Sequence, residues 1–158
     1  MSQLTNYTAE AFAIACEHGF HDTDLPDEHF KCLIVSELME AVEADRKGNR
    51  ANLESFDKLT QQGADFKKTF EHYIKDSVAD ELADACIRIF DFAGLRNIAL
   101  ESSMKINRRQ SPTFASRVYG IVQNFFDFRN AAISLNVTLN AIYNLAAELD
   151  IDLYRTSS

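Results

Sequence analysis

Two stretches of sequence predict the fold of this chain: LIVSELMEAVEADRKG at residues 33–48 and DSVADELADACIRIFDFAG at residues 76–94. Each stretch carries two acidic residues three positions apart, Glu37 with Glu40 and Glu81 with Asp84. Because an α-helix turns by about 100° per residue, each pair projects from one face of one helix. The same faces carry apolar residues, so the acids lie within stripes that are expected to be core. These apolar residues are Phe30, Leu33, Ile34, Ala41 and Ala44 beside Glu37, and Val78, Ala85, Ile89, Phe92 and Leu95 beside Glu81.

The four carboxylates predict a metal site. An ionised carboxylate that leaves water without a partner costs several kcal/mol, and few cations lie on these two faces. A hard divalent ion with oxygen ligands, Mg²⁺ above all and Mn²⁺ as a second choice, would supply the missing positive charge. The alternative is that the acids are solvated, as single acids on helices usually are.

The composition favours one all-α domain that spans residues 1–158. The chain has only two prolines and five glycines, and 46% of its residues are hydrophobic, which predicts long helices, few loops and a substantial core. Strand-like alternation is absent from the sequence, as are the hairpin turn dipeptides Asn-Gly and Asp-Gly. We therefore expect an all-α helical bundle.

Capping and helix-stopping residues predict the helix boundaries. Residues 49–75 have weaker periodicity and are interpreted as short helices divided at Gly63, or as a mobile segment. The expected major helices run from an N-cap at Thr8 to Gly19, from Pro26 to Lys47 before Gly48, from a cap at Asp76 or Ser77 to Leu95, over 100–109, from Ser111 and Pro112 through 114–134, and from Thr138 onward.

Charge and cysteine usage narrow the class of partner. A formal net charge of −8 disfavours binding to a nucleic-acid polymer, which needs a basic surface. No apolar run approaches the length of a membrane span, and the N-terminus does not resemble a signal peptide. Cys16, Cys32 and Cys86 are interpreted as reduced core residues, which favours a cytoplasmic protein without a membrane partner.

Other metal and phosphate chemistries fit this sequence poorly. A di-iron bundle needs Glu-x-x-His on two helices, and none of the four histidines has a glutamate three residues before it. Zinc is disfavoured by the lack of His and Cys ligands at suitable spacing. Glycine-rich phosphate loops are also absent from the sequence.

At the acidic pairs the chain resembles the MazG-like all-α nucleoside triphosphate pyrophosphohydrolases. The resemblance covers residues 13–109 and rests on E-x-x-E followed by E-x-x-D, with the flanks HGF, SE-x-x-EA, RKG and ELAD-x-x-IRI-x-D-x-AG. It implies Mg²⁺-dependent cleavage of a nucleoside triphosphate into a monophosphate and pyrophosphate. It also implies that Glu37, Glu40, Glu81 and Asp84 bind metal, that Glu37 and Glu40 are catalytic, and that the protein forms a homodimer or higher homo-oligomer.

The resemblance is less regular around the expected substrate-binding residues. By this resemblance Lys105, Asn107 and Arg109 would contact phosphate, although the spacing of Lys105 and Arg109 is shifted. Lys75 lies in the 49–75 insertion, whose lysines predict a cover over the phosphates; an ordinary solvated excursion is the alternative. Arg88, four residues after Asp84 on one face, is expected to brace that carboxylate from outside the metal site.

The sequence thus divides into catalytic helices at 8–110, interrupted by the 49–75 insertion, and a C-terminal helical extension at 111–158. Residues 121–128 align with residues 34–41, which places Asn124 and Asp127 at the positions of Glu37 and Glu40. The extension is then a degenerate, non-catalytic repeat, unless the match reflects only the general similarity of amphipathic helices. Two other functions stay open: a non-catalytic helical metal-binding or assembly module, and a pyrophosphohydrolase for a phosphoribosyl nucleotide.

Overall fold

The computed structural model describes residues 3–102 and 112–153, and within them it contains seven α-helices and no strand. The predicted all-α fold is therefore confirmed for this part of the chain. The helices are α1 (Gln3–Glu17), α2 (Asp27–Lys47), α3 (Leu53–Gln61), α4 (Phe66–Tyr73), α5 (Val78–Leu95), α6 (Phe114–Asp127) and α7 (Ala131–Glu148).

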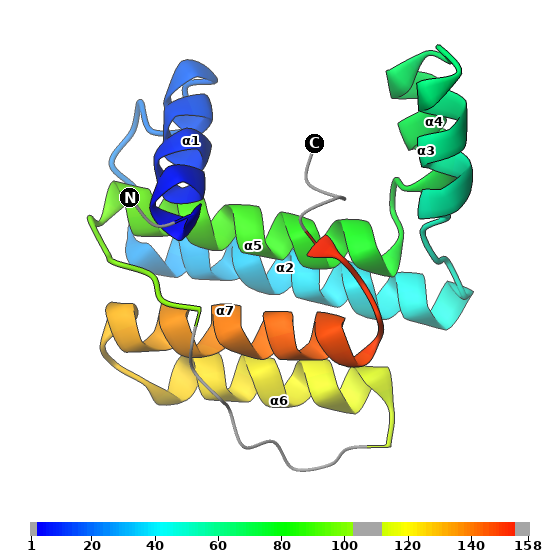
Figure 1. The fold of residues 1–158 in the computed structure, drawn as a ribbon. Helices are drawn as coiled ribbons and strands as arrows, with labels where there is room; N and C mark the ends of the chain where they lie inside the picture. Colours follow the sequence, from blue (N-terminus) through cyan, green and yellow to red (C-terminus); the bar gives the residue numbers. More distant parts are fainter. Residues whose placement is uncertain (1–2, 103–111, 154–158) are drawn as a thin grey trace.

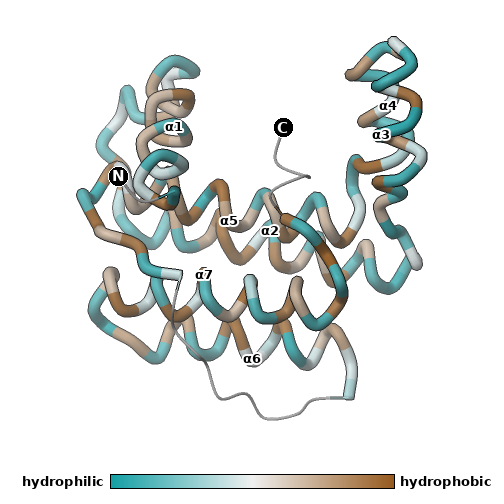
Figure 2. The backbone as a smooth tube through the Cα atoms, viewed as in Figure 1, coloured by the Kyte–Doolittle hydropathy of each residue, from teal (hydrophilic) through white to brown (hydrophobic). Residues whose placement is uncertain are grey.

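Four of these helices form a bundle of two antiparallel pairs (Figure 1). Helix α2 packs along α5 and α6 packs along α7, while α5 also contacts α7 and α2 contacts α6. In Figure 2 hydrophobic and hydrophilic residues alternate along these helices, as expected for amphipathic helices. The apolar sides meet in one core, in which Leu38, Phe92, Phe125, Leu139 and Ile142 are fully buried.

Local signals explain the ends of α2 and α5. Pro26 precedes α2, and Gly48 ends it in the left-handed conformation, with φ of 70°. The side chain of Ser77 caps α5 by accepting a hydrogen bond from the backbone N–H of Asp80. Both helices therefore have the predicted boundaries within one residue.

Two predicted boundaries are wrong. Helix α1 begins at Gln3, so that Thr8 lies inside the helix rather than at its N-cap. The break between the last two helices falls at residues 128–130, where the Asn130 side chain caps α7 by accepting from Ile133 N. Thr138 is consequently buried in the middle of α7 instead of starting it. Thr138 is fully buried, and sequence periodicity does not measure such burial.

Other expectations concern single residues or segments. Cys86 is buried as predicted, but Cys16 and Cys32 are exposed and the prediction of a core position for them is wrong. Residues 100–102 are not helical, and the remainder of the helix expected over 100–109 lies mostly outside the described residues. Across residues 3–102 and 112–153, no helix is long and apolar enough to cross a membrane.

Helix α1 crosses α5 at a point that only glycine permits. A Cβ atom at Gly94 would lie 2.6 Å from Cβ of Phe12 and 3.1 Å from the carbonyl oxygen of Thr8. The missing side chain lets the two helices touch at this end of α5 (Figure 1).

The segment 49–75 is a helical hairpin formed by α3 and α4, which confirms the expectation of short helices there. The rings of Phe56, Phe66 and Phe70 pack against one another between the two helices. The backbone N–H of Asn52 donates to the carbonyl oxygen of Tyr73 at 2.8 Å and closes the base of the hairpin. In Figure 1 this hairpin and α1 both project from the α2–α5 pair, on the side away from α6–α7.

Candidate metal centre

The packing of α2 against α5 brings three of the predicted ligands together. Glu37, Glu40 and Glu81 each offer a carboxylate oxygen, and these oxygens all lie within 4.8 Å of one another. Glu81 is 5% exposed and Glu37 9%, whereas Glu40 is exposed. The acidic cluster, defined as these three residues, therefore has two members within the protein and one that opens to solvent.

The negative charge of the acidic cluster exceeds the positive charge of the described residues around it. Burial, followed by repulsion from Glu40, Asp80, Asp84 and Glu37, raises the pKa of Glu81 from 4.5 to about 7. These are the carboxylates that a bound cation would keep ionised.

Asp84 lies beside the cluster and shares its field. Burial raises the pKa of Asp84 from 3.8 to about 6, repulsion from Asp80, Glu37 and Glu40 adds to the increase, and the Arg88 guanidinium opposes it. Asp84 is half-buried and, among the described residues, does not belong to a group of three acids within 4.8 Å. It therefore lies in the electrostatic neighbourhood of the acidic cluster without being part of it.

Arg88 makes its hydrogen bond across the two helices. Its Nε donates to Oε1 of Glu37 at 3.0 Å, whereas the sequence placed it as a partner of Asp84 on its own helix. Among the described residues, Arg88 forms the only ion pair with any of Glu37, Glu40, Glu81 and Asp84. One guanidinium therefore faces four carboxylates.

A second acidic group adjoins the first and was not predicted. Asp76, Asp80 and Glu81 also offer oxygens within 4.8 Å of one another, so Glu81 is common to both groups. The backbone N–H of Asp76, which has a positive φ of 57°, donates to Oδ2 of Asp80 at 2.9 Å. Burial raises the pKa of the Asp80 carboxyl. The signal was available, since Asp80 lies four residues before Asp84 and shares its helical face.

The structure describes only part of the predicted substrate contacts. Lys75 is exposed, and its charge opposes the rise in the pKa of Asp80 that burial causes, which places Lys75 near the second acidic group. Lys105, Asn107 and Arg109 lie outside the described residues.

Two polar contacts that the sequence did not reveal fix the start of α2 against the end of α5. Nε2 of His21 lies 2.7 Å from Oδ1 of Asp91, and both side chains are largely buried. Nε of Arg96 donates to Oδ1 of Asp27 at 2.8 Å. These contacts tie the connection before α2 to α5 and so hold in register the two helices that carry the acids.

The corresponding positions of the C-terminal pair carry no such cluster. Asn124 is half-buried and Asp127 is exposed on α6, and neither belongs to a group of three metal-ligating side chains within the described part of the chain. Helices α6 and α7 thus pair as α2 and α5 do, but without the concentration of acids.

The donor set of the acidic cluster consists of carboxylate oxygens alone, which suits a hard divalent cation such as Mg²⁺ or Mn²⁺ better than zinc or copper. The chain matches no protein-family model, no curated protein and no solved structure. Its resemblance to the MazG-like enzymes therefore rests on the sequence motifs within residues 13–109 alone.

Proposed function

We propose that the protein is a Mg²⁺-dependent nucleotide pyrophosphohydrolase of the MazG-like type. One observation carries the proposal: two helices bring carboxylate oxygens of Glu37, Glu40 and Glu81 within 4.8 Å of one another, and among the described residues a single arginine forms an ion pair with any of them. Repulsion and burial at this place favour a cation whose ligands are oxygens. The fit of the donor set and the motif around it both support a metal-dependent hydrolase.

In this proposal each acidic residue has a role. Glu37, Glu40, Glu81 and Asp84 would hold the metal, and Arg88 would orient Glu37 through its hydrogen bond. The bound Mg²⁺ would neutralise phosphate oxygens and position the substrate.

In the proposed reaction a residue of the protein accepts the proton of the attacking water. Water attacks the α-phosphorus, the bond from this phosphorus to the bridging oxygen breaks, and pyrophosphate leaves with the electron pair. Glu40, which is exposed and belongs to the cluster, would accept the proton of the attacking water.

The decisive experiment separates products by ion-exchange chromatography. The purified protein is incubated with Mg²⁺ and each of the common ribo- and deoxyribonucleoside triphosphates, and with a phosphoribosyl nucleotide as an additional substrate. We expect a monophosphate and pyrophosphate. Formation of a diphosphate and orthophosphate would contradict the assignment even if the protein is active, and no turnover of any nucleotide would favour the alternative of a non-catalytic metal-binding or assembly module.

The family resemblance also leads us to propose a homodimer or a higher homo-oligomer. Sedimentation equilibrium over a range of protein concentrations tests this independently of activity, because the association state does not depend on turnover. A monomer at all concentrations would contradict it.

A further inference from the structure

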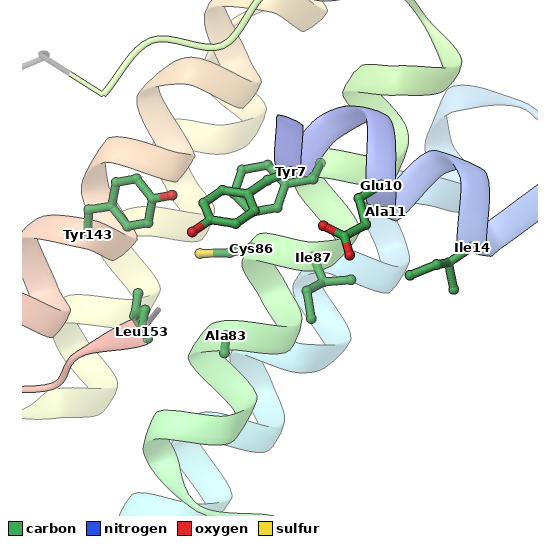
Figure 3. A pocket seen from close by; sticks show the side chains of 10 residues that line it. Tyr7, Glu10, Ala11, Ile14, Ala83, Cys86, Ile87, Tyr143 and Leu153 are labelled. Carbon is green, nitrogen blue, oxygen red and sulfur yellow. The ribbon is translucent and has the colours of Figure 1, made fainter. Parts of the chain in front are cut away.

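An open cavity of about 340 Å³ lies between α1, α5 and α7 (Figure 3). Its lining is mainly apolar and includes Tyr7 from α1, Cys86 and Phe90 from α5, Tyr143 from α7, and Leu153. Such a volume accommodates a small organic molecule. The cavity forms because α1 crosses α5 near one end and diverges from it along the remaining length.

This cavity is separate from the acidic cluster. On α5 the cavity is lined at positions 83, 86, 87 and 90, whereas Glu81, Asp84 and Arg88 occupy another face. Positions 83, 86 and 90 follow positions 81, 84 and 88 by two residues, which corresponds to about 200° around the helix, while Ile87 lies about 60° from Asp84. Most of the cavity lining on α5 therefore faces away from the acids, and none of the proposed metal ligands lines the cavity.

The chemistry of the lining is aromatic and anionic. The rings of Tyr7 and Phe90 lie 5.6 Å apart, with 30° between their planes. Figure 3 shows the hydroxyl groups of Tyr7 and Tyr143 directed toward one another above Cys86. No lysine or arginine in the described part of the chain lines the cavity.

Glu10 supplies a negative charge at the opening. It lies on α1, and Figure 3 shows its carboxylate directed toward the space beside Cys86 and Ile87. Within the described ranges Glu10 has neither a hydrogen bond nor an ion pair from its side chain, unlike the other acids of this bundle that have basic partners. A carboxylate beside aromatic rings attracts a cation, and the faces of those rings reinforce the attraction.

We propose that this cavity binds a small organic ammonium ion, with its apolar body among Tyr7, Phe90 and Tyr143 and its positive charge at Glu10. The apolar lining selects for a hydrocarbon portion, and the carboxylate with the ring faces selects for positive charge. An inorganic cation would lack the apolar contacts, and an anionic ligand would be repelled by Glu10 and by the net charge of −8.

The test compares three probes of similar size by isothermal titration calorimetry at low salt. These are benzyltrimethylammonium, benzyl alcohol and phenylmethanesulfonate, which are cationic, neutral and anionic. We expect binding to decrease in that order. Glu10→Gln should weaken binding of the ammonium probe by about fivefold and leave the alcohol unchanged, because only the charge is removed. Glu17→Gln, on the exposed part of the same helix, is the matched control.

A second pair of variants tests the aromatic contribution. Tyr143→Leu should weaken the ammonium probe more than the alcohol, and Tyr119→Leu, an exposed position on α6, should change neither. Circular dichroism verifies that each variant is folded, and the exposed Glu10→Gln variant provides the test if Tyr143→Leu is not. The proposal is overturned if no probe binds at about 10 mM, if the alcohol or the sulfonate binds as tightly as the ammonium, or if Glu10→Gln has no effect.

Discussion

Helices α7 and α5 both bury polar side chains, but the partners of these side chains differ. On α7 the hydroxyl of Ser134 donates to the carbonyl oxygen of Phe125, and the amide of Asn136 donates to Ala99 and Ala132 and accepts from Glu101 N. On α5 the buried carboxylates of Asp80 and Glu81 face other carboxylates.

The contrast extends to individual exceptions. Asp91 of α5 is buried as well, yet it is paired with His21. On α7 the buried hydroxyl of Thr138 has no hydrogen-bond partner among the described residues. Neither exception alters the difference in charge, because α7 buries neutral groups and α5 concentrates anions.

We interpret this difference as a loss of stability that is accepted for the sake of a function. A buried polar group that is fully hydrogen-bonded contributes to a unique structure, whereas a cluster of mutually repelling acids destabilises the fold unless a ligand neutralises it. Natural sequences depart from local consistency mainly at functional sites. The α2–α5 pair is therefore the functional half of the bundle in our interpretation, and the α6–α7 pair supports it.

The largest effect is expected from removing a charge in the functional half. Glu81→Gln should reduce pyrophosphohydrolase activity by at least about a hundredfold, because it removes a proposed metal ligand and keeps the shape of the side chain. Stability in the absence of Mg²⁺ should be unchanged or increased, since repulsion is relieved. Initial rates with saturating Mg²⁺, together with thermal unfolding, measure both quantities.

Asp127→Asn provides the matched control for that substitution. Asp127 aligns with Glu40 and is exposed as Glu40 is, but among the described residues it belongs to no group of clustered acids, so its loss should leave the rate within a factor of two of the unmodified protein. Equal losses from both substitutions, or near-normal activity of Glu81→Gln, would remove the distinction between the two helix pairs.

In the α6–α7 pair a substitution is expected to reduce stability and to leave activity unchanged. Asn136→Ala should lower the free energy of unfolding by about 1–3 kcal/mol, because it leaves backbone groups of the segment before α6 without partners. Activity measured well below the melting temperature should be retained. Urea denaturation tests this, with the exposed Gln123→Ala as control. A stable but inactive Asn136→Ala would show that α7 takes part in the chemistry.

The sequence predicted the elements whose signals are local. Pro26 and Gly48 bound α2 as expected, and the i, i+3 spacing of Glu37 with Glu40 placed both on one face. The boundary between α6 and α7 was wrong because Asn130, a good capping residue, was passed over for Thr138, which packing buries.

Contacts between distant residues were harder to predict. Arg88 meets Glu37 on another helix, and the cavity at Tyr7 and Tyr143 joins residues from opposite ends of the chain. Such contacts depend on the angle and register at which helices pack, and helical periodicity does not encode these quantities.

The dependence of stability on pH should also distinguish the acidic α2–α5 pair from the α6–α7 pair. In the folded protein the pKa of Glu81 is raised from 4.5 to about 7 and that of Asp84 from 3.8 to about 6. At a pH between the ordinary and the raised pKa of each group, the folded state binds more protons than the unfolded state. The free energy of unfolding should therefore decrease as the pH rises from about 5 to about 7.5, through both raised pKa values.

Mg²⁺ should oppose this decrease, because a cation bound to the folded state stabilises the ionised carboxylates. Urea denaturation at pH 5.5, 6.5 and 7.5, with and without millimolar Mg²⁺, measures the effect. Glu81→Gln should flatten the pH dependence without Mg²⁺, whereas Asn136→Ala should lower stability equally at each pH. A melting temperature that Mg²⁺ leaves unchanged at pH 7.5 would count against a preformed metal site.

The smallest effect concerns the cations of the α3–α4 hairpin, which the sequence predicted to cover the phosphates. Lys67 and Lys68 are exposed on α4, and Lys75 follows the hairpin, where its charge acts on Asp80. Because Lys75 is close to the acids, Lys75→Ala should raise KM for a triphosphate several-fold, with little change in kcat. The increase should diminish at high salt, since an exposed charge is screened.

The double variant Lys67→Ala, Lys68→Ala distinguishes a cover from a fixed scaffold. If the hairpin closes over the substrate, this variant should also raise KM, and hydrogen exchange in residues 53–73 should slow when Mg²⁺ and a non-hydrolysable triphosphate are added. If the hairpin stays where its base is hydrogen-bonded, through Asn52 and Tyr73, only Lys75→Ala should matter and exchange should not respond to ligand. That result would mean that, of these three lysines, only Lys75 offsets the negative charge of the phosphates, and that the hairpin is a fixed part of the scaffold.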